Sequence, residues 1–317
     1  MFRQQTKIES IVLLRGLAAL GVCATHYYII NGDKFSPLIK QLFMSGQLGV
    51  SIFFVISGFV LPYSISKINY TIAGFPNFML KRLLRIEPPY WATIALLFIV
   101  GIVPWQSFDI RQLAVNIFHI APLFKNYNWY SPIFWTLSIE FQYYILLGLF
   151  FSPLMRCKPA VSILIICGIS VISVLAKLNI RDLVFTHWYD FAAGYIAFMC
   201  MTNKIRTQTA IIYLAAFCAI VVWGVSIITG TLPFITVVII LFFNKKPYKP
   251  FLFLGNVSYS LYLTHTVVIF FFLKFAKAYL SNQVVLFTLA ILFCVCFAAL
   301  FYTIIEKPVL RRSKKLQ

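Results

Sequence analysis

Long apolar stretches separated by short polar segments run along almost the whole chain. About ten of them approach the roughly 17–25 residues that cross a lipid bilayer. They cover residues 11–30, 46–66, 86–103, 131–151, 160–176, 184–202, 209–228, 230–243, 251–273 and 283–305. Lipid offers the backbone no hydrogen-bond partners, so spans of this length are expected to be helices. The pattern predicts an all-α, polytopic transmembrane helical bundle of about ten spans.

The stretch 230–243 is the shortest, and we expect it to follow 209–228 through Thr229 and Gly230. The alternative is one span fewer, which would put the two chain ends on opposite sides of the membrane. Composition supports the membrane class, because 61% of the residues are hydrophobic and only 11% are charged. A soluble globule of this length could not bury so much apolar surface.

Basic residues outnumber acidic ones by 27 to 8, which gives a net charge of +19. They lie between apolar stretches, which favours membrane topology over nucleic-acid binding. With the N-terminus inside, the 27 basic residues less Arg15 divide into 18 inside and eight outside, the latter being Lys34, Lys40, Arg111, Lys125, Lys177, Arg181, Lys274 and Lys277. We therefore expect both termini in the cytoplasm and a plasma (inner) membrane location. We also expect a single membrane domain over residues 1–317, with no soluble domain.

Ionisable residues inside a span are costly and need an explanation. The first span holds Arg15 and His26, eleven residues apart. At 100° per residue they share a helix face, about 16 Å apart along the axis. The alternatives are a snorkelling arginine and a structural histidine. The shared face favours a functional pair, with His26 as a candidate catalytic base.

The fourth span holds Glu140 in the segment FWTLSIEFQYY. By helical rise, Glu140 and His26 lie at compatible depths, so a contact between them is expected. A carboxylate beside a histidine fixes its tautomer and stabilises the imidazolium. The alternative is a packing role, with Glu140 bonded to a serine or tyrosine.

The segment KRLLRIEPPYW carries Arg82 and Arg85, neighbours on one helical face. Paired guanidinium groups at a membrane surface suit phosphate, although ordinary topogenic charge is the alternative. Pro88 and Pro89 are expected to break the helix and to place Tyr90 at the interface.

A polar stripe is expected in the ninth span, where Tyr259, Tyr262 and His265 recur every third residue. Interhelical hydrogen bonding is the alternative explanation for it. Asp190, His187 and Glu306 are weaker candidates, and His119 carries no further signal. The spacing of the histidines indicates no metal site.

Six collinear elements resemble the acyltransferase-3 family of integral membrane acyltransferases, over about residues 8–311. They are the Arg15 and His26 pair, FFVISGF (53–59), RLLRIEPPYW (82–91), FWTLSIEFQYY (134–144), GNVSYSLYLTH (255–265) and EKP (306–308). The chain departs from the family pattern at Glu87, where the family often has an apolar or aromatic residue. We also expect no appended hydrolase-like domain, which some relatives carry.

The resemblance implies transfer of an acyl group, usually acetyl, from cytoplasmic acyl-CoA to a hydroxyl of a surface or lipid-linked glycan. It implies a catalytic His26 assisted by Glu140, and acyl-CoA contacts from Arg15, Arg82, Arg85 and Tyr90. Ser57, Trp135, Ser138, Tyr259 and His265 would form a supporting polar seam. No permanently bound cofactor is expected, since acetyl-CoA would serve as the donor substrate.

Two mechanistic routes stay open, namely direct attack of the hydroxyl on the thioester and a two-step route through an acyl-histidine. Two other classes of function also stay open. One is a secondary transporter of a small solute or sugar, although no inverted repeat is evident. The other is a purely structural membrane protein.

Overall fold

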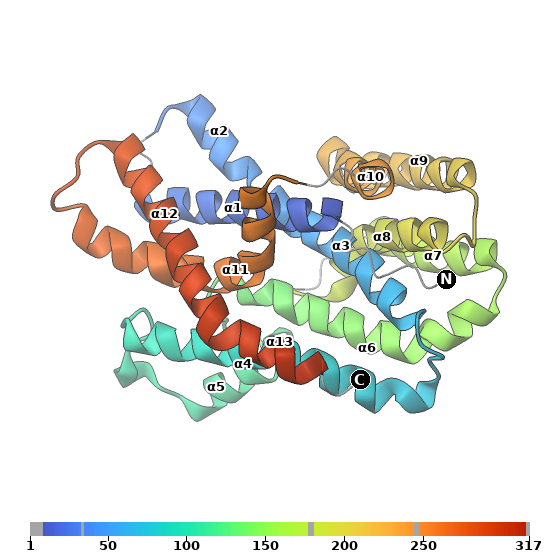
Figure 1. Cartoon of the computed structure of the whole chain (residues 1–317), viewed down its shortest axis with the longest axis horizontal. Coiled ribbons are helices and arrows are strands. Elements are labelled where there is room, and N and C mark those ends of the chain that lie inside the picture. The colour runs from blue at the N-terminus through green and yellow to red at the C-terminus, as the bar shows by residue number, and fades with distance from the viewer. Residues whose placement is uncertain (1–8, 33–34, 177–180, 244–246, 315–317) are drawn as a thin grey trace. The chain divides into compact units, whose positions relative to one another are not determined.

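The chain is almost entirely helical in a computed structural model that describes residues 9–32, 35–176, 181–243 and 247–314 (Figure 1). The α-helices are α1 (Glu9–Asn31), α2 (Pro37–Ser45), α3 (Leu48–Ile65), α4 (Phe75–Ile99), α5 (Ile110–Ile117), α6 (Phe134–Arg156), α7 (Pro159–Leu175), α8 (Trp188–Met201), α9 (Thr207–Gly224), α10 (Ile227–Phe242), α11 (Lys249–Ala276), α12 (Gln283–Phe301) and α13 (Lys307–Lys314). A π-helical turn, η5 (Tyr302–Glu306), joins the last two. No β-strand occurs in the described segments, so the all-α prediction is confirmed.

Six helical segments in the described ranges are long and apolar enough to cross a membrane, which supports a multi-pass membrane protein. They are α1, α2 with α3, α6, α9, α11, and α12 with the helix that continues it. The predicted count of about ten spans is not confirmed. Helices α7 and α10 are apolar but shorter, with 17 and 16 residues, and α8 has 14. At 1.5 Å per residue, 14 residues reach only about 21 Å, less than the hydrocarbon thickness.

The predicted helix break at Pro88 and Pro89 is wrong, because α4 runs through both prolines. The helix also begins eleven residues before the predicted start of this span, so Arg82 and Arg85 lie within α4 itself. A proline removes one backbone donor, and other groups can contact the carbonyls near it. The hydroxyl of Tyr259 donates to the carbonyl of Ile86 over 3.0 Å, beside the two prolines.

The turn between α9 and α10 also lies earlier than predicted. Helix α9 ends at Gly224, and the Ser226 side chain caps α10 by accepting from the amide of Thr229 over 3.1 Å. Gly230 therefore lies inside α10, where a Cβ would come within 2.7 Å of the Cys218 carbonyl oxygen of α9. The glycine serves close helix packing and not a turn.

The chain forms two compact units, of which unit 1 comprises residues 1–11, 50–79 and 136–247. Helix α8 is its core element, because nearly all of its residues are buried and it packs on α7, α9 and α10. Segment 50–65 of α3 approaches α8 backbone to backbone. A Cβ on Gly58 would lie 2.3 Å from the Phe191 oxygen, and one on Gly194 would lie 2.1 Å from the Val55 oxygen.

Unit 2 comprises residues 12–49, 80–135 and 248–317, and its largest helix pair is α11 with α12. Helix α11 is buried along most of its middle, from Val257 to Ile269. The remaining elements of unit 2 are most of α1, α2, most of α4, α5 and the η5–α13 segment. This unit holds Arg15, His26, Arg82, Arg85 and His265.

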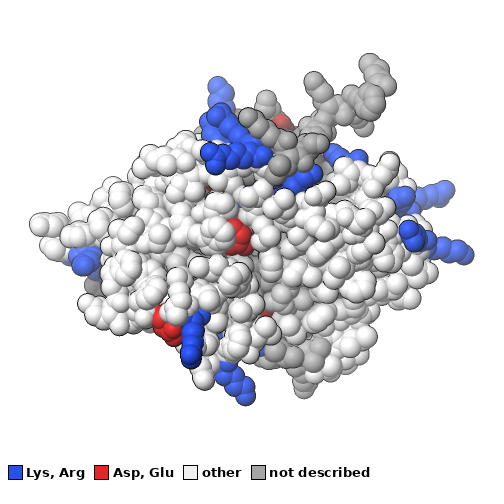
Figure 2. Space-filling model, turned by 90° about the horizontal axis from the view of Figure 1, so that it is seen from below, with Lys and Arg blue, Asp and Glu red and all other residues white. Residues whose placement is uncertain are grey.

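Charged side chains cover little of the face that Figure 2 draws. Figure 2 shows Lys and Arg side chains gathered at a few places, with most of the visible face uncharged. Large apolar side chains such as Leu164, Trp223 and Ile304 are more than 60% exposed on helices of the two units. Exposed apolar helix faces of this kind suit contact with lipid.

Candidate functional site

A pair of histidines lies where α1 and α11 meet in unit 2. Nε2 of His265 is 3.1 Å from Nδ1 of His26, and the ring centroids are 4.9 Å apart. Each Nδ1 also lies near a carbonyl of its own helix, at 3.0 Å from the Val22 oxygen and 3.1 Å from the Leu261 oxygen. His265 is fully buried, whereas His26 is only partly buried. Of the pair, His26 is therefore the ring that a substrate could reach.

Two glycines explain how these helices come so close. A Cβ on Gly16 would lie 3.0 Å from the amide nitrogen of Gly255, and a Cβ on Gly255 would lie 2.1 Å from the Val12 oxygen. Each histidine follows its glycine by ten residues on the same helix. The glycines meet, and ten residues later in both helices the histidines meet, so α1 and α11 run in the same direction. The first and ninth spans of the predicted order would also run in the same direction.

We expect Gly255→Val to destabilise the protein and to disturb the histidine pair, because the new side chain would meet the α1 backbone. Overpacking of this kind costs about 1–3 kcal/mol of unfolding free energy. Thermal unfolding in detergent measures the effect. Gly168→Val is the matched control, since nothing lies within 4 Å of a Cβ there. Equal melting temperatures for the two variants would contradict the close approach.

A second group in unit 2 combines cations with a buried carboxylate. Glu306 lies in the π-helical turn η5 and accepts a hydrogen bond of 2.5 Å from the hydroxyl of Ser260 on α11. Arg15 of α1 and Arg85 of α4 lie near enough to attract this carboxylate electrostatically. The fold thus brings together two arginines that are 70 positions apart in the chain. The sequence offered Glu306 only as a weaker candidate, and the structure places two arginines near it.

Arg82 and Arg85 are both partly buried on α4, three residues apart as predicted. Ile86 follows Arg85 in the chain, and its carbonyl accepts a hydrogen bond from the hydroxyl of Tyr259 on α11. Tyr259 and His265 therefore take part in different contacts, one with α4 and one with α1. The polar stripe on α11 joins three helices of unit 2.

Sequence analysis assigned no role to His119, yet the structure buries it against Glu87. Its Nε2 lies 3.0 Å from Glu87 Oε1, and its ring stacks on Tyr90 with centroids 4.6 Å apart. Tyr90 is fully buried and donates to the Asn116 carbonyl over 2.9 Å. The predicted contact of Tyr90 with acyl-CoA stays a prediction. Because histidine and carboxylate are distant in sequence, no local motif could have revealed this pair.

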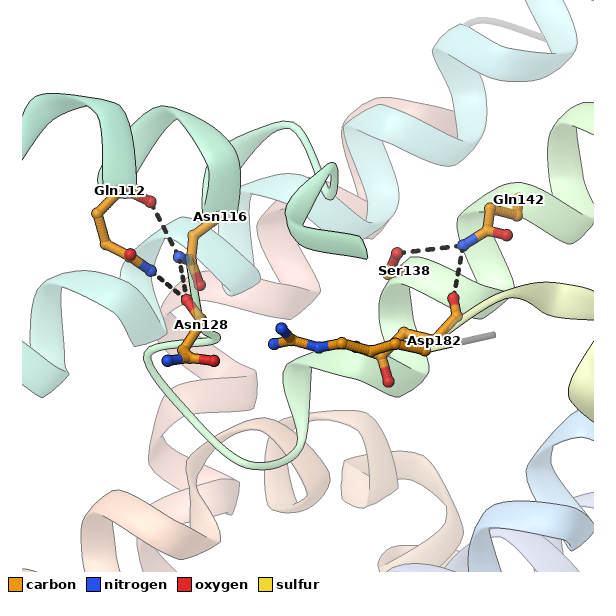
Figure 3. Close-up of polar contacts among 7 residues, drawn as sticks. Gln112, Asn116, Asn128, Ser138, Gln142 and Asp182 are labelled. Carbon is orange, nitrogen blue, oxygen red and sulfur yellow. Dashed lines mark hydrogen bonds and ion pairs between the residues drawn. The ribbon is translucent and has the colours of Figure 1, made fainter. Parts of the chain in front are cut away.

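Amide side chains fasten the segment after α4 in the same unit (Figure 3). The Asn116 amide donates to the carbonyls of Gln112 at 2.9 Å and Asn128 at 3.1 Å, and Gln112 also donates to Asn128. The Asn116 side-chain oxygen accepts from the Tyr130 amide over 3.0 Å. The segment between α4 and α6 is thus ordered around α5.

Glu140 belongs to unit 1, where its Oε1 accepts a hydrogen bond of 2.6 Å from the hydroxyl of Ser57. The predicted contact between Glu140 and His26 stays a prediction. Ser138 is fully buried and accepts from the Gln142 amide over 3.3 Å, and Gln142 also donates to the Asp182 carbonyl (Figure 3). Trp135, at the start of α6, is partly buried.

The Ser57–Glu140 bond makes the role of the carboxylate testable. The predicted contact with His26 implies that Glu140→Gln lowers acyl transfer at least about tenfold, because a neutral amide cannot stabilise an imidazolium. The amide can still accept from Ser57, so the fold should persist. Ser57→Ala is the matched control, which removes the hydrogen bond and keeps the charge. Rates measured on purified protein would assign Glu140 to packing if Glu140→Gln were no slower than Ser57→Ala.

Asp190, the weaker candidate of unit 1, is fully buried on α8. Ser51 donates a hydrogen bond to one of its oxygens, and Nδ1 of His187 lies 3.8 Å from the other. No group of three or more His, Cys, Asp or Glu side chains that could hold a metal ion occurs within the described ranges. The predicted absence of a metal site stays a prediction for the whole chain.

Comparison with known proteins identifies the class to which this fold and these residues belong. Residues 8–303 match the acyltransferase-3 family, described as an acyltransferase domain. Because the match covers most of both units, the chain belongs to this family. The match favours the acyltransferase interpretation over a transporter or a structural protein.

Particular relatives carry names consistent with this class. The chain is 26% identical over 378 residues to "Putative O-acetyltransferase SACOL0978" of Staphylococcus aureus (strain COL), covering 99% of this chain and 59% of that protein. It is 26% identical to "Exopolysaccharide production protein ExoZ" of Rhizobium meliloti, covering 86% and 92% of the two chains. It is 22% identical to "Putative acetyltransferase ORF330" of Acidianus two-tailed virus, covering 81% and 82%. The chain thus spans about three fifths of the staphylococcal relative. No solved structure matches.

Proposed function

We propose that this protein transfers an acyl group, in the simplest case acetyl, from acyl-CoA to a hydroxyl of a surface or lipid-linked glycan. The observation that carries the proposal is the partly exposed His26, whose Nδ1 contacts the Val22 carbonyl and His265. The same helix, α1, also bears Arg15. Family membership and the relatives' names support acyl transfer. The name of the rhizobial relative supports a polysaccharide acceptor.

The cationic residues suit the donor. Acyl-CoA is strongly anionic at its nucleotide end, and guanidinium groups bind phosphate through paired hydrogen bonds. Arg15, Arg82 and Arg85 supply three such groups in unit 2. Along α1, about 16 Å separates Arg15 from His26, a distance that the long pantetheine arm could span. We place this donor site on the cytoplasmic side, in the plasma membrane, because basic residues favour that side.

His26 then acts as the general base in our proposal. Its Nε2 takes the proton from the acceptor hydroxyl while the oxygen attacks the thioester carbon. The new carbon–oxygen ester bond forms, the carbon–sulfur bond breaks, and the proton moves from His26 to the departing thiolate. The products are an acylated glycan and free CoA, and His26 returns to its neutral form.

Purified full-length protein in lipid nanodiscs, supplied with acetyl-CoA labelled in the acetyl group, tests the reaction. We expect CoA release that depends on an added glycan fraction, with the label recovered in that fraction. Mass spectrometry of glycans from cells that carry or lack the gene identifies the acceptor. Absence of both CoA release and acetyl-CoA binding in folded protein would reject the proposed function.

A further inference from the structure

The contacts around the two histidines determine which ring nitrogens carry protons. A backbone carbonyl can only accept a hydrogen bond, so a ring nitrogen that bonds to one must be protonated. Nδ1 of His265 lies 3.1 Å from the Leu261 oxygen, and Nδ1 of His26 lies 3.0 Å from the Val22 oxygen. Both neutral rings are therefore protonated at Nδ1.

The contact between the rings then has only one direction. Nε2 of neutral His265 carries a lone pair and lies 3.1 Å from Nδ1 of His26, so it accepts from the His26 N–H. His26 shares this proton between His265 and the Val22 carbonyl. Its own Nε2 keeps a lone pair, and His26 is the partly exposed residue of the pair. The reverse assignment would leave unprotonated nitrogens facing both carbonyls.

We propose that His265 is a positioning residue that stabilises the protonated form of His26 during acyl transfer, an inference that rests on the proposed function. When His26 takes the acceptor's proton, the ring becomes a cation whose Nδ1–H points at the lone pair of His265. In this pair a neutral imidazole serves as the orienting partner of the catalytic histidine. Since His265 is fully buried, it acts on the reaction only through His26.

Two substitutions separate this role from packing. His265→Phe keeps an aromatic ring and removes the lone pair, and His265→Gln keeps an acceptor oxygen on a chain of similar reach. We expect His265→Phe to lower kcat about 10- to 100-fold, the effect of losing one hydrogen bond to a charged group. The KM for acetyl-CoA should change less than about twofold, and His265→Gln should recover most of the rate.

Thr264→Val is the matched control on α11. It removes a buried hydroxyl that donates to the Ser260 carbonyl over 2.8 Å, one residue from His265. We expect near wild-type kcat from this variant. Wild-type kcat in folded His265→Phe would overturn the proposal, and so would a His265→Gln variant as slow as His265→Phe.

Nitrogen-15 NMR of histidine-labelled protein tests the pair without turnover. The chain has only four histidines, so single variants assign the signals. We expect His26 and His265 both protonated at Nδ1 at neutral pH, with coupling across the bond between them. A proton on Nε2 of either neutral ring would overturn the proposal. A confirmed pair together with absent acetyl-CoA turnover would instead reject the proposed function.

Discussion

Replacing His26 by alanine is expected to lower acyl transfer by about 100- to 10,000-fold, because a positioned general base contributes roughly that much to a rate. His26 is the partly exposed member of a pair whose partner is fully buried. The loss should appear in kcat, while acetyl-CoA still binds through the arginines. Initial rates of CoA release and a binding titration on the same preparation measure the two quantities.

Ile29→Ala is the matched control for this experiment, since Ile29 lies one turn further along α1 with 53% of its surface exposed. It should keep the wild-type rate within about twofold, as surface substitutions usually have small effects. Near-normal transfer by a folded His26→Ala variant would remove His26 from the catalytic assignment. The family membership of the chain would stand, because it rests on the match over residues 8–303.

Removing the Arg85 side chain is expected to weaken acyl-CoA binding about tenfold to a hundredfold. A hydrogen bond between charged groups is worth roughly 1.5–3 kcal/mol, and each 1.4 kcal/mol is a factor of ten in affinity. Arg85 lies close enough to Glu306 to attract its carboxylate, and so does Arg15. Arg85→Lys should restore only part of the affinity, because an ammonium group lacks the planar fork.

Titration of CoA against wild type, Arg85→Ala and Arg85→Lys at two salt concentrations measures this effect. Binding should weaken as salt rises, since the contact is electrostatic and lies near water. Lys81→Ala is the matched control, because Lys81 is a partly buried cation on the same helix. Equal dissociation constants for the three Arg85 forms would mean that this arginine serves membrane topology alone.

Helix boundaries near proline and glycine show where local rules were insufficient. Pro88 and Pro89 predicted a break, but α4 continues through them. Gly230 predicted a turn, but it lies within α10 against α9. At Gly230 the neighbouring helix α9 decides the outcome, because the two helices approach closely there. Local propensity is a weak guide wherever packing competes with it.

The candidate site shows the same division between local pattern and long-range contact. The shared face of Arg15 and His26 follows from helical periodicity alone and was predictable. The contact of His26 with His265 was not predictable, because it depends on how α1 packs against α11 and the two histidines are 239 positions apart in the chain. The Glu87–His119 pair was missed for the same reason, because the two residues are 32 positions apart in the chain. The backbone at His119 is also left-handed, with φ at 57°, a local conformation that the sequence did not indicate.

By itself, the sequence determined the membrane class, the helical architecture and the positions of the ionisable residues, because apolar length and helical periodicity are local properties. It also indicated the family, through six short elements in a fixed order. Only the tertiary structure decided which polar groups meet: His26 with His265, Glu306 with Ser260 near two arginines, and Glu140 with Ser57. A buried polar group must find partners where lipid offers none, and helix packing alone determines which partners are within reach.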